Sequence, residues 1–156
     1  MDFMVRAINS RNVTATLVLV KAVTGGGQAV DVPGTVDIQP MVAQLDGKGN
    51  AMPHGTIYNV PYVRAQGGTN AVIIDPVVGD IGLAVFASHD ISSVKASKKP
   101  ANPGSRRRFD WADAIYVGGM LNAAPAQYIR FTSTGDVEIK PAGKVTIIGA
   151  DRKSVV

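Results

Sequence analysis

The sequence predicts an all-β protein with one barrel-like domain and a short repetitive tail. Two features of composition support this class: only 18% of the 156 residues are charged, and 17 glycines and 9 prolines supply many turns. The third feature is a pattern of short apolar runs, each bounded by Gly, Pro, Asn or Asp. With 46% apolar residues, the chain can bury a core of its own.

Five strand-like runs precede residue 88, and their number and spacing are typical of a five-stranded OB-type barrel. They cover residues 13–24, 29–43 with an interruption at Pro33-Gly34, 56–63, 72–74 and 81–87. Pro61 indicates that the third run lies at a sheet edge or contains a bulge, because proline has no N–H to donate to a ladder. We expect the last two runs, joined by a stiff turn at 76–80, to form the central hairpin of the barrel.

Outside these runs the organisation is simpler. Residues 1–12 are expected to form an arm, with a short helix over 2–10. After residue 94 comes a stretch with almost nothing to bury, and then a further strand at 115–117. The predicted domains are therefore a barrel over 13–126 and a tail over 127–156.

The stretch 95–108 is an exposed basic loop with six Lys and Arg residues and no acidic residue. Removing its charges from the net +4 leaves −2 for the rest of the chain, so the positive charge is local. It could contact an acidic protein partner, and an alternative is phosphate binding by an OB-type single-stranded nucleic-acid protein. Nucleic acid is the less favoured partner, because aromatic side chains for stacking bases are few. The candidate contact residues are Lys98, Lys99, Arg106, Arg107 and Arg108.

The tail contains an eight-residue repeat. Pairs of apolar residues flank one polar residue in each copy, which is the alternation of a strand. The pairs are Ile129 and Phe131, Val137 and Ile139, and Val145 and Ile147. Three copies of the chain wound around a common axis would bury these stripes, whereas an ordinary meander with a turn at 141–143 would explain the same spacing. Spacing alone leaves both possibilities open.

No constellation of residues supports catalysis or cofactor binding. His54 and His89 stand alone, no Gly-x-Ser-x-Gly motif is present, and the aspartates Asp75 and Asp80 are explained by turn hydrogen bonds. There is no cysteine, and no run reaches the roughly 18 apolar residues of a membrane-spanning helix. We expect a protein without enzymatic activity, metal or cofactor.

Several separate motifs, spread over about 13–130, resemble the N-terminal domain of central spike proteins from contractile-tailed bacteriophage baseplates. They are GTVDIQPMVAQLDG (34–47), PHG (53–55), QGG (66–68), NAVIIDP (70–76), VGDIGLAVF (78–86), DISSV (90–94) and NPGSRRRF (102–109). The resemblance implies an OB-fold domain that trimerises and docks on the baseplate hub, followed by an intertwined triple-stranded β-helix, which we expect to be short in this chain. It also implies a place in the virion, at the distal tip of the tail tube, and a role in piercing the host outer membrane when the sheath contracts.

The sequence departs from these spikes in two ways. They usually carry a longer β-helix, and a tip domain with a His-x-His metal motif, and neither is found here. We therefore expect a short or truncated spike, or one capped by a separate tip protein, and no metal is carried over.

Overall fold

The computed structural model describes residues 4, 12–25 and 33–149. The chain divides into two compact units, Met1–Asn122 and Ala123–Val156, and each is described by itself. The expected helix at 2–10 falls almost entirely outside the described residues, as does the strand portion at 29–32.

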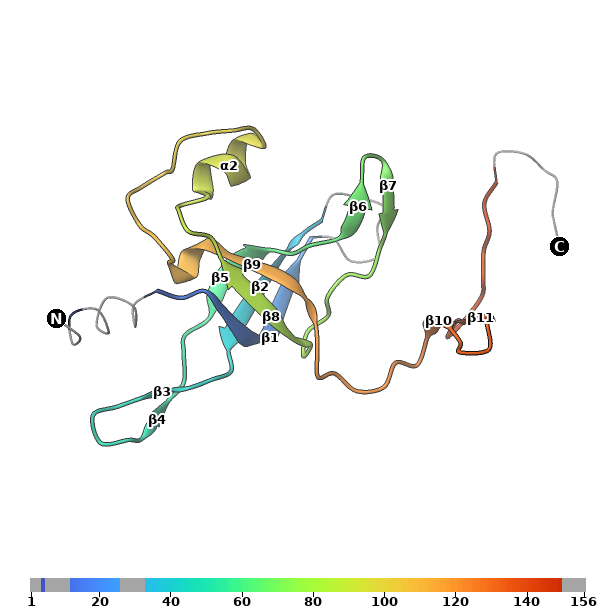
Figure 1. The fold of residues 1–156 in the computed structure, drawn as a ribbon, viewed down its shortest axis with the longest axis horizontal. Helices are drawn as coiled ribbons and strands as arrows, with labels where there is room; N and C mark the ends of the chain where they lie inside the picture. Colours follow the sequence, from blue (N-terminus) through green and yellow to red (C-terminus); the bar gives the residue numbers. More distant parts are fainter. Residues whose placement is uncertain (1–3, 5–11, 26–32, 150–156) are drawn as a thin grey trace. The chain divides into compact units, whose positions relative to one another are not determined.

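The first unit is built on one curled antiparallel sheet of five strands, in the order β5-β2-β1-β8-β9 (Figure 1). The strands are β1 (Ala15–Thr24), β2 (Thr35–Pro40), β5 (Ile57–Pro61), β8 (Ile81–Phe86) and β9 (Ala114–Gly119). The prediction of an all-β protein is confirmed. The edge position expected from Pro61 is also confirmed, because β5 ends the sheet.

The core follows from strand alternation. In β2 and β8 every second residue is buried, because successive side chains point to opposite faces of a strand. The inward residues of the sheet meet in one cluster, formed by Val18, Val20, Val36, Ile38, Val60, Tyr62, Ala84, Phe86, Ala114 and Tyr116. A single sheet buries this cluster only by curling around it.

The curl brings the end of β5 toward β9. Tyr62 forms a parallel bridge with Tyr116, and the N–H of Val63 donates to the carbonyl of Tyr116 at 3.0 Å. The register of the ladders shifts in β1, in β2 and between β8 and β9, and such bulges increase local bend and twist. The result is a half-barrel.

The prediction that the runs at 72–74 and 81–87 form a central hairpin is wrong. Residues 70–72 form β7 (Asn70–Val72), which pairs with β6 (Ala65–Gly67) in a separate two-stranded sheet, while β8 pairs with β1 and β9. Val72 is 60% exposed and Ile74 is 82% exposed. A run of three apolar residues is too short to fix a buried strand, and the fifth barrel strand is β9 instead.

The turn expected at 76–80 is present, but it leads from the β6–β7 hairpin into the barrel. Gly79 adopts φ 95°, a conformation that favours glycine, and its N–H donates to the carbonyl of Val20 in β1 at 2.9 Å. The carboxylate of Asp80 accepts from the N–H of Val77 at 2.9 Å. The turn-bonding role expected for Asp80 is therefore confirmed.

Three further short elements lie in the described part of the first unit. The hairpin of β3 (Gln44–Leu45) and β4 (Ala51–Met52) projects from the body, with its turn held by the Asp46 carboxylate (Figure 1). The six-residue helix α2 (Ser92–Ser97) opens the basic stretch, and the 3-10 turn η1 (Trp111–Asp113) closes it.

In the described residues of the second unit, β10 (Tyr128–Phe131) and β11 (Val137–Lys140) form a hairpin. Its turn is tied by hydrogen bonds between Thr132 and Asp136 in both backbone and side chain. The turn between these two strands lies at 132–136, and their antiparallel pairing within one chain is of the kind that a meander has. Residues 141–143, where the meander alternative placed a turn, are followed by no strand among the described residues. The third repeat, at Val145 and Ile147, forms no strand in the described chain.

Candidate functional site

The β10–β11 hairpin has one wholly apolar face. Directly opposed residues of an antiparallel pair point to the same side, and so do residues two apart along a strand. The pairs Ile129–Ile139 and Phe131–Val137 therefore share one face. The exposed fractions of these four residues are 55–79%, so within this chain the face is left open.

The other face of the hairpin is polar. Arg130 and Glu138 stand opposite each other, with Arg130 Nη2 and Nε within 2.9 and 3.1 Å of the carboxylate. The Arg130 guanidinium and the Lys140 ammonium lie 6.0 and 5.8 Å from the centroid of the Tyr128 ring. One face is therefore suited to water, and the opposite face is suited to a partner.

Repeat residues beyond the hairpin are also exposed. Val145 is 52% exposed and Ile147 is 91% exposed. All six residues predicted for the trimer axis therefore lie in the second unit, and the structure brings four of them onto one face.

In the first unit, Arg107 does not project from the loop as its neighbours do. Its guanidinium reaches Asp113 at 2.6 and 2.8 Å and Asp90 at 2.8 Å. The two aspartate side chains are only 0% and 2% exposed, whereas that of Arg107 is 34% exposed. Of the five cations that we predicted to meet a partner, Arg107 is thus engaged inside the protein.

Further hydrogen bonds to Asp90 and Asp113 hold other parts of the basic stretch and its flanks in place. Asp90 accepts from the Ser105 hydroxyl at 2.7 Å and from the Ser92 N–H at 2.9 Å, and Asp113 accepts from the Ile91 N–H at 3.0 Å. Gly104 packs so closely here that a Cβ would overlap Ser92 Oγ. The stretch is therefore exposed but anchored.

These contacts lower the pKa values of the Asp90 and Asp113 carboxyl groups. Hydrogen bonds from Ser92, then from Ser105, and the charge of Arg107 lower the pKa of Asp90 to about 2. The Arg107 hydrogen bonds are the largest cause that lowers the pKa of Asp113. Both groups stay charged at any pH near neutrality, so the ion pairs persist there.

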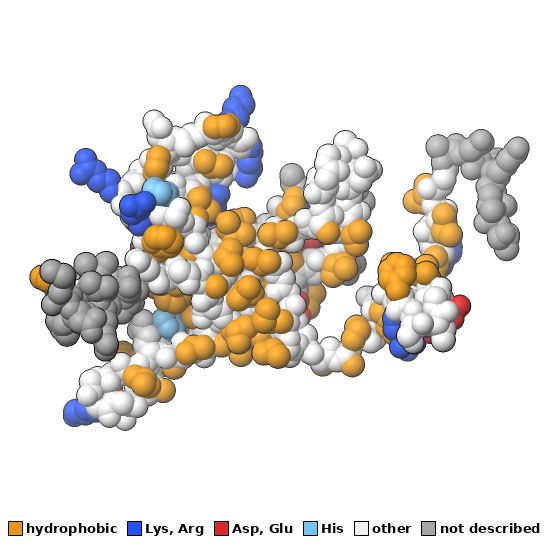
Figure 2. All heavy atoms as spheres, in the orientation of Figure 1, with side chains coloured by type: hydrophobic (Ala, Val, Ile, Leu, Met, Phe, Trp, Pro, Cys, Tyr) orange, Lys and Arg blue, Asp and Glu red, His pale blue; other side chains and the backbone are white. Residues whose placement is uncertain are grey.

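Four cations remain on the outside, namely Lys98, Lys99, Arg106 and Arg108, and we name them the basic crown. Among the described residues, none of the four lies within ion-pair distance of a carboxylate. Arg108 contacts His89 Nε2 at 3.0 Å. Figure 2 shows most of the Lys and Arg side chains of the first unit gathered around α2 and the segment that follows it.

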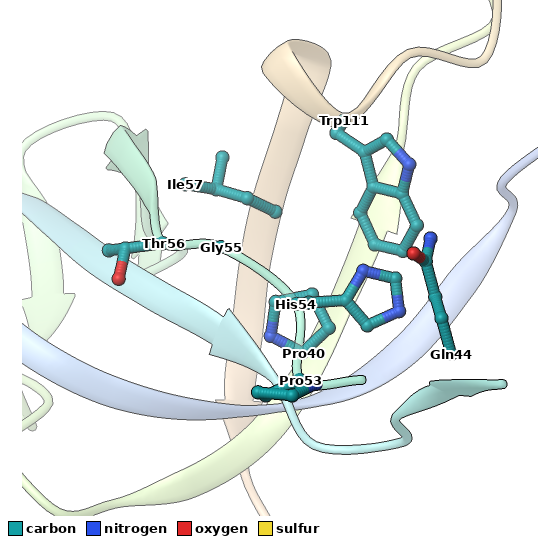
Figure 3. A pocket seen from close by; sticks show the side chains of 8 residues that line it. All are labelled: Pro40, Gln44, Pro53, His54, Gly55, Thr56, Ile57 and Trp111. Carbon is teal, nitrogen blue, oxygen red and sulfur yellow. The ribbon is translucent and has the colours of Figure 1, made fainter. Parts of the chain in front are cut away.

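A hollow of about 370 Å³ lies beside η1, lined in part by Pro40, Gln44 and His54 (Figure 3). The His54 ring lies 4.8 Å from the Trp111 ring, and Trp111 in turn packs edge-on against the core residue Phe86 at 5.0 Å. His54 is the one titratable side chain in this lining. The hollow brings together no pair of acid and base groups, and no group of three metal-ligating side chains occurs among the residues described.

Sequence reasoning did not identify Asp90 and Asp113 as the partners of Arg107. A signal was present, because the two aspartates bracket a stretch of six cations that has no acid of its own. The sequence does not say which of three consecutive arginines turns inward.

No protein-family model matches the sequence, and no curated protein is significantly similar to it. Within the described residues, no helix combines the length and the apolar character needed to cross a membrane.

Proposed function

We propose that the chain is a structural protein that works as a homotrimer, with an OB-type first unit and a second unit that begins an intertwined β-helical shaft. The apolar face of the β10–β11 hairpin carries the proposal. A two-stranded hairpin cannot cover such a face by itself. Around a common axis, three copies cover each other's apolar faces and leave the Arg130–Glu138 face in water.

The likeness of motifs to central spike proteins gives this assembly a role. The trimer is a spike at the distal tip of a contractile phage tail, docked on the baseplate hub and open to capping by a separate tip protein. When the sheath contracts, a stiff shaft transmits the force to a small area of the host outer membrane. The proposed function is mechanical, and it depends on the packing of apolar side chains in the shaft.

Docking on the hub is assigned to the basic crown. The crown residues sit on a segment anchored by the Arg107 ion pairs, so less conformational entropy is lost when they bind. Long-range attraction between such a cluster and an acidic protein surface speeds association and fixes orientation.

Matched charge substitutions on the two faces of the hairpin test the trimer. Ile139→Lys places three ammonium groups against the apolar axis, each at a cost of several kcal/mol without a partner. Glu138→Lys adds the same side chain to the polar face. We expect Ile139→Lys to give monomers of 16.3 kDa by light scattering, and Glu138→Lys to keep the mass of the unsubstituted protein. An Ile139→Lys variant with unchanged mass and melting would contradict the axial role.

A second candidate is single-stranded nucleic-acid binding by the first unit, and the unpaired basic crown is the observation that favours it. Fluorescence anisotropy with oligothymidylate separates the two functions. The spike proposal predicts no binding at physiological ionic strength. Binding that weakens steeply with salt, and that is lost in Arg106→Ala and Arg108→Ala, would favour the second candidate.

A further inference from the structure

His89 lies beside the basic crown and contacts one of its arginines. Nη2 of Arg108 lies 3.0 Å from Nε2 of the His89 ring, and Nδ1 of the same ring lies 2.9 Å from the Ser88 hydroxyl oxygen. The histidine stands in the segment before α2, and the arginine stands in the segment after it. Both ring nitrogens are therefore engaged, although His89 and Arg108 are exposed.

The contact with Arg108 determines which ring nitrogen carries a proton. A guanidinium group can only donate hydrogen bonds, so Nε2 of His89 must be the acceptor and must hold a lone pair. The ring is then neutral, and its one N–H proton is on Nδ1, which donates to the Ser88 hydroxyl. The observed arrangement thus requires one tautomer of the neutral imidazole.

A second proton on His89 is incompatible with this contact. The imidazolium ring donates from both nitrogens and carries a positive charge, so Nε2–H would face an N–H of Arg108. Histidine gains this proton between about pH 5 and pH 8. Protonation therefore releases Nη2 of Arg108 and adds one positive charge beside the four cations of the crown.

The carboxylates of the two segments are engaged elsewhere. Among the described residues, none lies within ion-pair distance of the His89 ring. Asp90, the next residue, binds Arg107 at 2.8 Å, and its pKa is lowered to about 2, so it stays charged near neutrality. Asp110 accepts from the N–H of Ala112 at 2.9 Å.

The cations around the ring also leave Arg108 as its charged neighbour. On α2, the ammonium group of Lys95 bonds the Asn59 carbonyl at 3.3 Å. In the described chain, the other crown cations make no hydrogen bond to the ring; they are Lys98, Lys99 and Arg106. The state of His89 thus acts directly on Arg108.

We propose that His89 holds Arg108 in a pH-sensitive manner, and that docking of an acidic partner on the crown is coupled to uptake of a proton by His89. The inference rests on the docking role proposed for the crown and adds its regulation. A partner carboxylate competes with neutral His89 for Nη2 of Arg108, but it accepts from both Nη2 and a protonated Nε2. Because the partner binds the protonated form more tightly, its affinity must fall as the pH rises.

Binding of an acidic probe at two pH values tests this coupling. The probe is a fluorescein-labelled oligoaspartate peptide, and its anisotropy is measured with the full chain at constant ionic strength, at about pH 8 and about pH 5.5. Aspartate stays largely ionised at both, since its ordinary pKa is about 3.9. We expect an affinity about threefold higher at the lower pH, which corresponds to one exposed ion pair.

Two substitutions identify the group that takes up the proton. His89→Gln keeps a polar side chain but has no proton to gain, so its affinity should be equal at both pH values. His54→Gln removes the other histidine of the chain and should keep the full dependence. A dependence that persists in His89→Gln would overturn the inference.

Nitrogen NMR of isotope-labelled histidine locates the ring proton without any partner. We expect the proton of neutral His89 on Nδ1, and loss of that preference in Arg108→Ala. A proton on Nε2 in the neutral unsubstituted protein would overturn the inference. Probe binding with equal affinity at both pH values would also overturn it and leave the docking role of the crown intact, whereas absence of binding at both would overturn the inference and the docking role together.

Discussion

Replacement of Arg107 by alanine should destabilise the first unit far more than replacement of either neighbouring arginine. The substitution removes three hydrogen bonds and leaves two carboxylates, 0% and 2% exposed, without their cation. Breaking a buried ion pair from one side typically costs about 3–5 kcal/mol. Because the Arg107 side chain is 34% exposed and water can partly replace it, we expect a loss near the lower end, about 3 kcal/mol.

The assay is thermal unfolding followed by circular dichroism at equal protomer concentration, since melting of an oligomer depends on concentration. A loss of about 3 kcal/mol corresponds to a fall of roughly 10 °C for a unit of this size. Arg106→Ala is the matched control, because Arg106 makes no ion pair among the described residues, and it should melt within about 2 °C of the unsubstituted protein. Equal melting of the two variants would refute the anchoring role of Arg107.

Two further predictions concern the same region. The pKa of Asp90 is about 2 in the folded protein against about 3.9 when unfolded, so its stabilisation is complete above about pH 4 and is lost as the pH falls through 2. The melting temperature should therefore drop across this window. It should drop less in Arg107→Ala, because that substitution removes the hydrogen bonds that are the largest cause of the lowered pKa of Asp113. Parallel pH profiles of the two proteins would contradict this. Gly104→Ala should cost about 1–3 kcal/mol in urea unfolding because its Cβ overlaps Ser92, whereas Gly47→Ala, with open space around it, should cost much less; equal costs would contradict the close packing at Gly104.

The sequence predicted most of the barrel because strand alternation is a local signal. β1, β2, β8 and β9 each contain β-branched residues at alternating positions, whereas those of β5, Ile57 and Val60, stand three apart. All five strands were expected within a few residues. The error at 72–74 arose because three apolar residues carry no periodicity. Whether such a run is buried depends on its partners, and here the partner is the short exposed strand β6.

The two candidate surfaces differed in how far the sequence could predict them. The eight-residue spacing already placed Ile129, Phe131, Val137 and Ile139 on one stripe, since register and side-chain direction are tied together in a strand. The basic stretch was visible as a charge run, but Arg106, Arg107 and Arg108 are identical in type. Only the contacts with Asp90 and Asp113 in the folded protein distinguish Arg107 from its two exposed neighbours.

Ile129, Phe131, Val137 and Ile139 are exposed on the β10–β11 hairpin of the single chain. In the proposed trimer, self-association around one symmetry axis covers this face.

The most direct test of the central claim is the mass of the unsubstituted protein in solution, measured by light scattering after size exclusion at micromolar concentration. Three copies of the 16.3 kDa chain predict about 49 kDa, unchanged on dilution across the micromolar range. A particle of 16.3 kDa would contradict self-association, and one of about 33 kDa would contradict the threefold shaft.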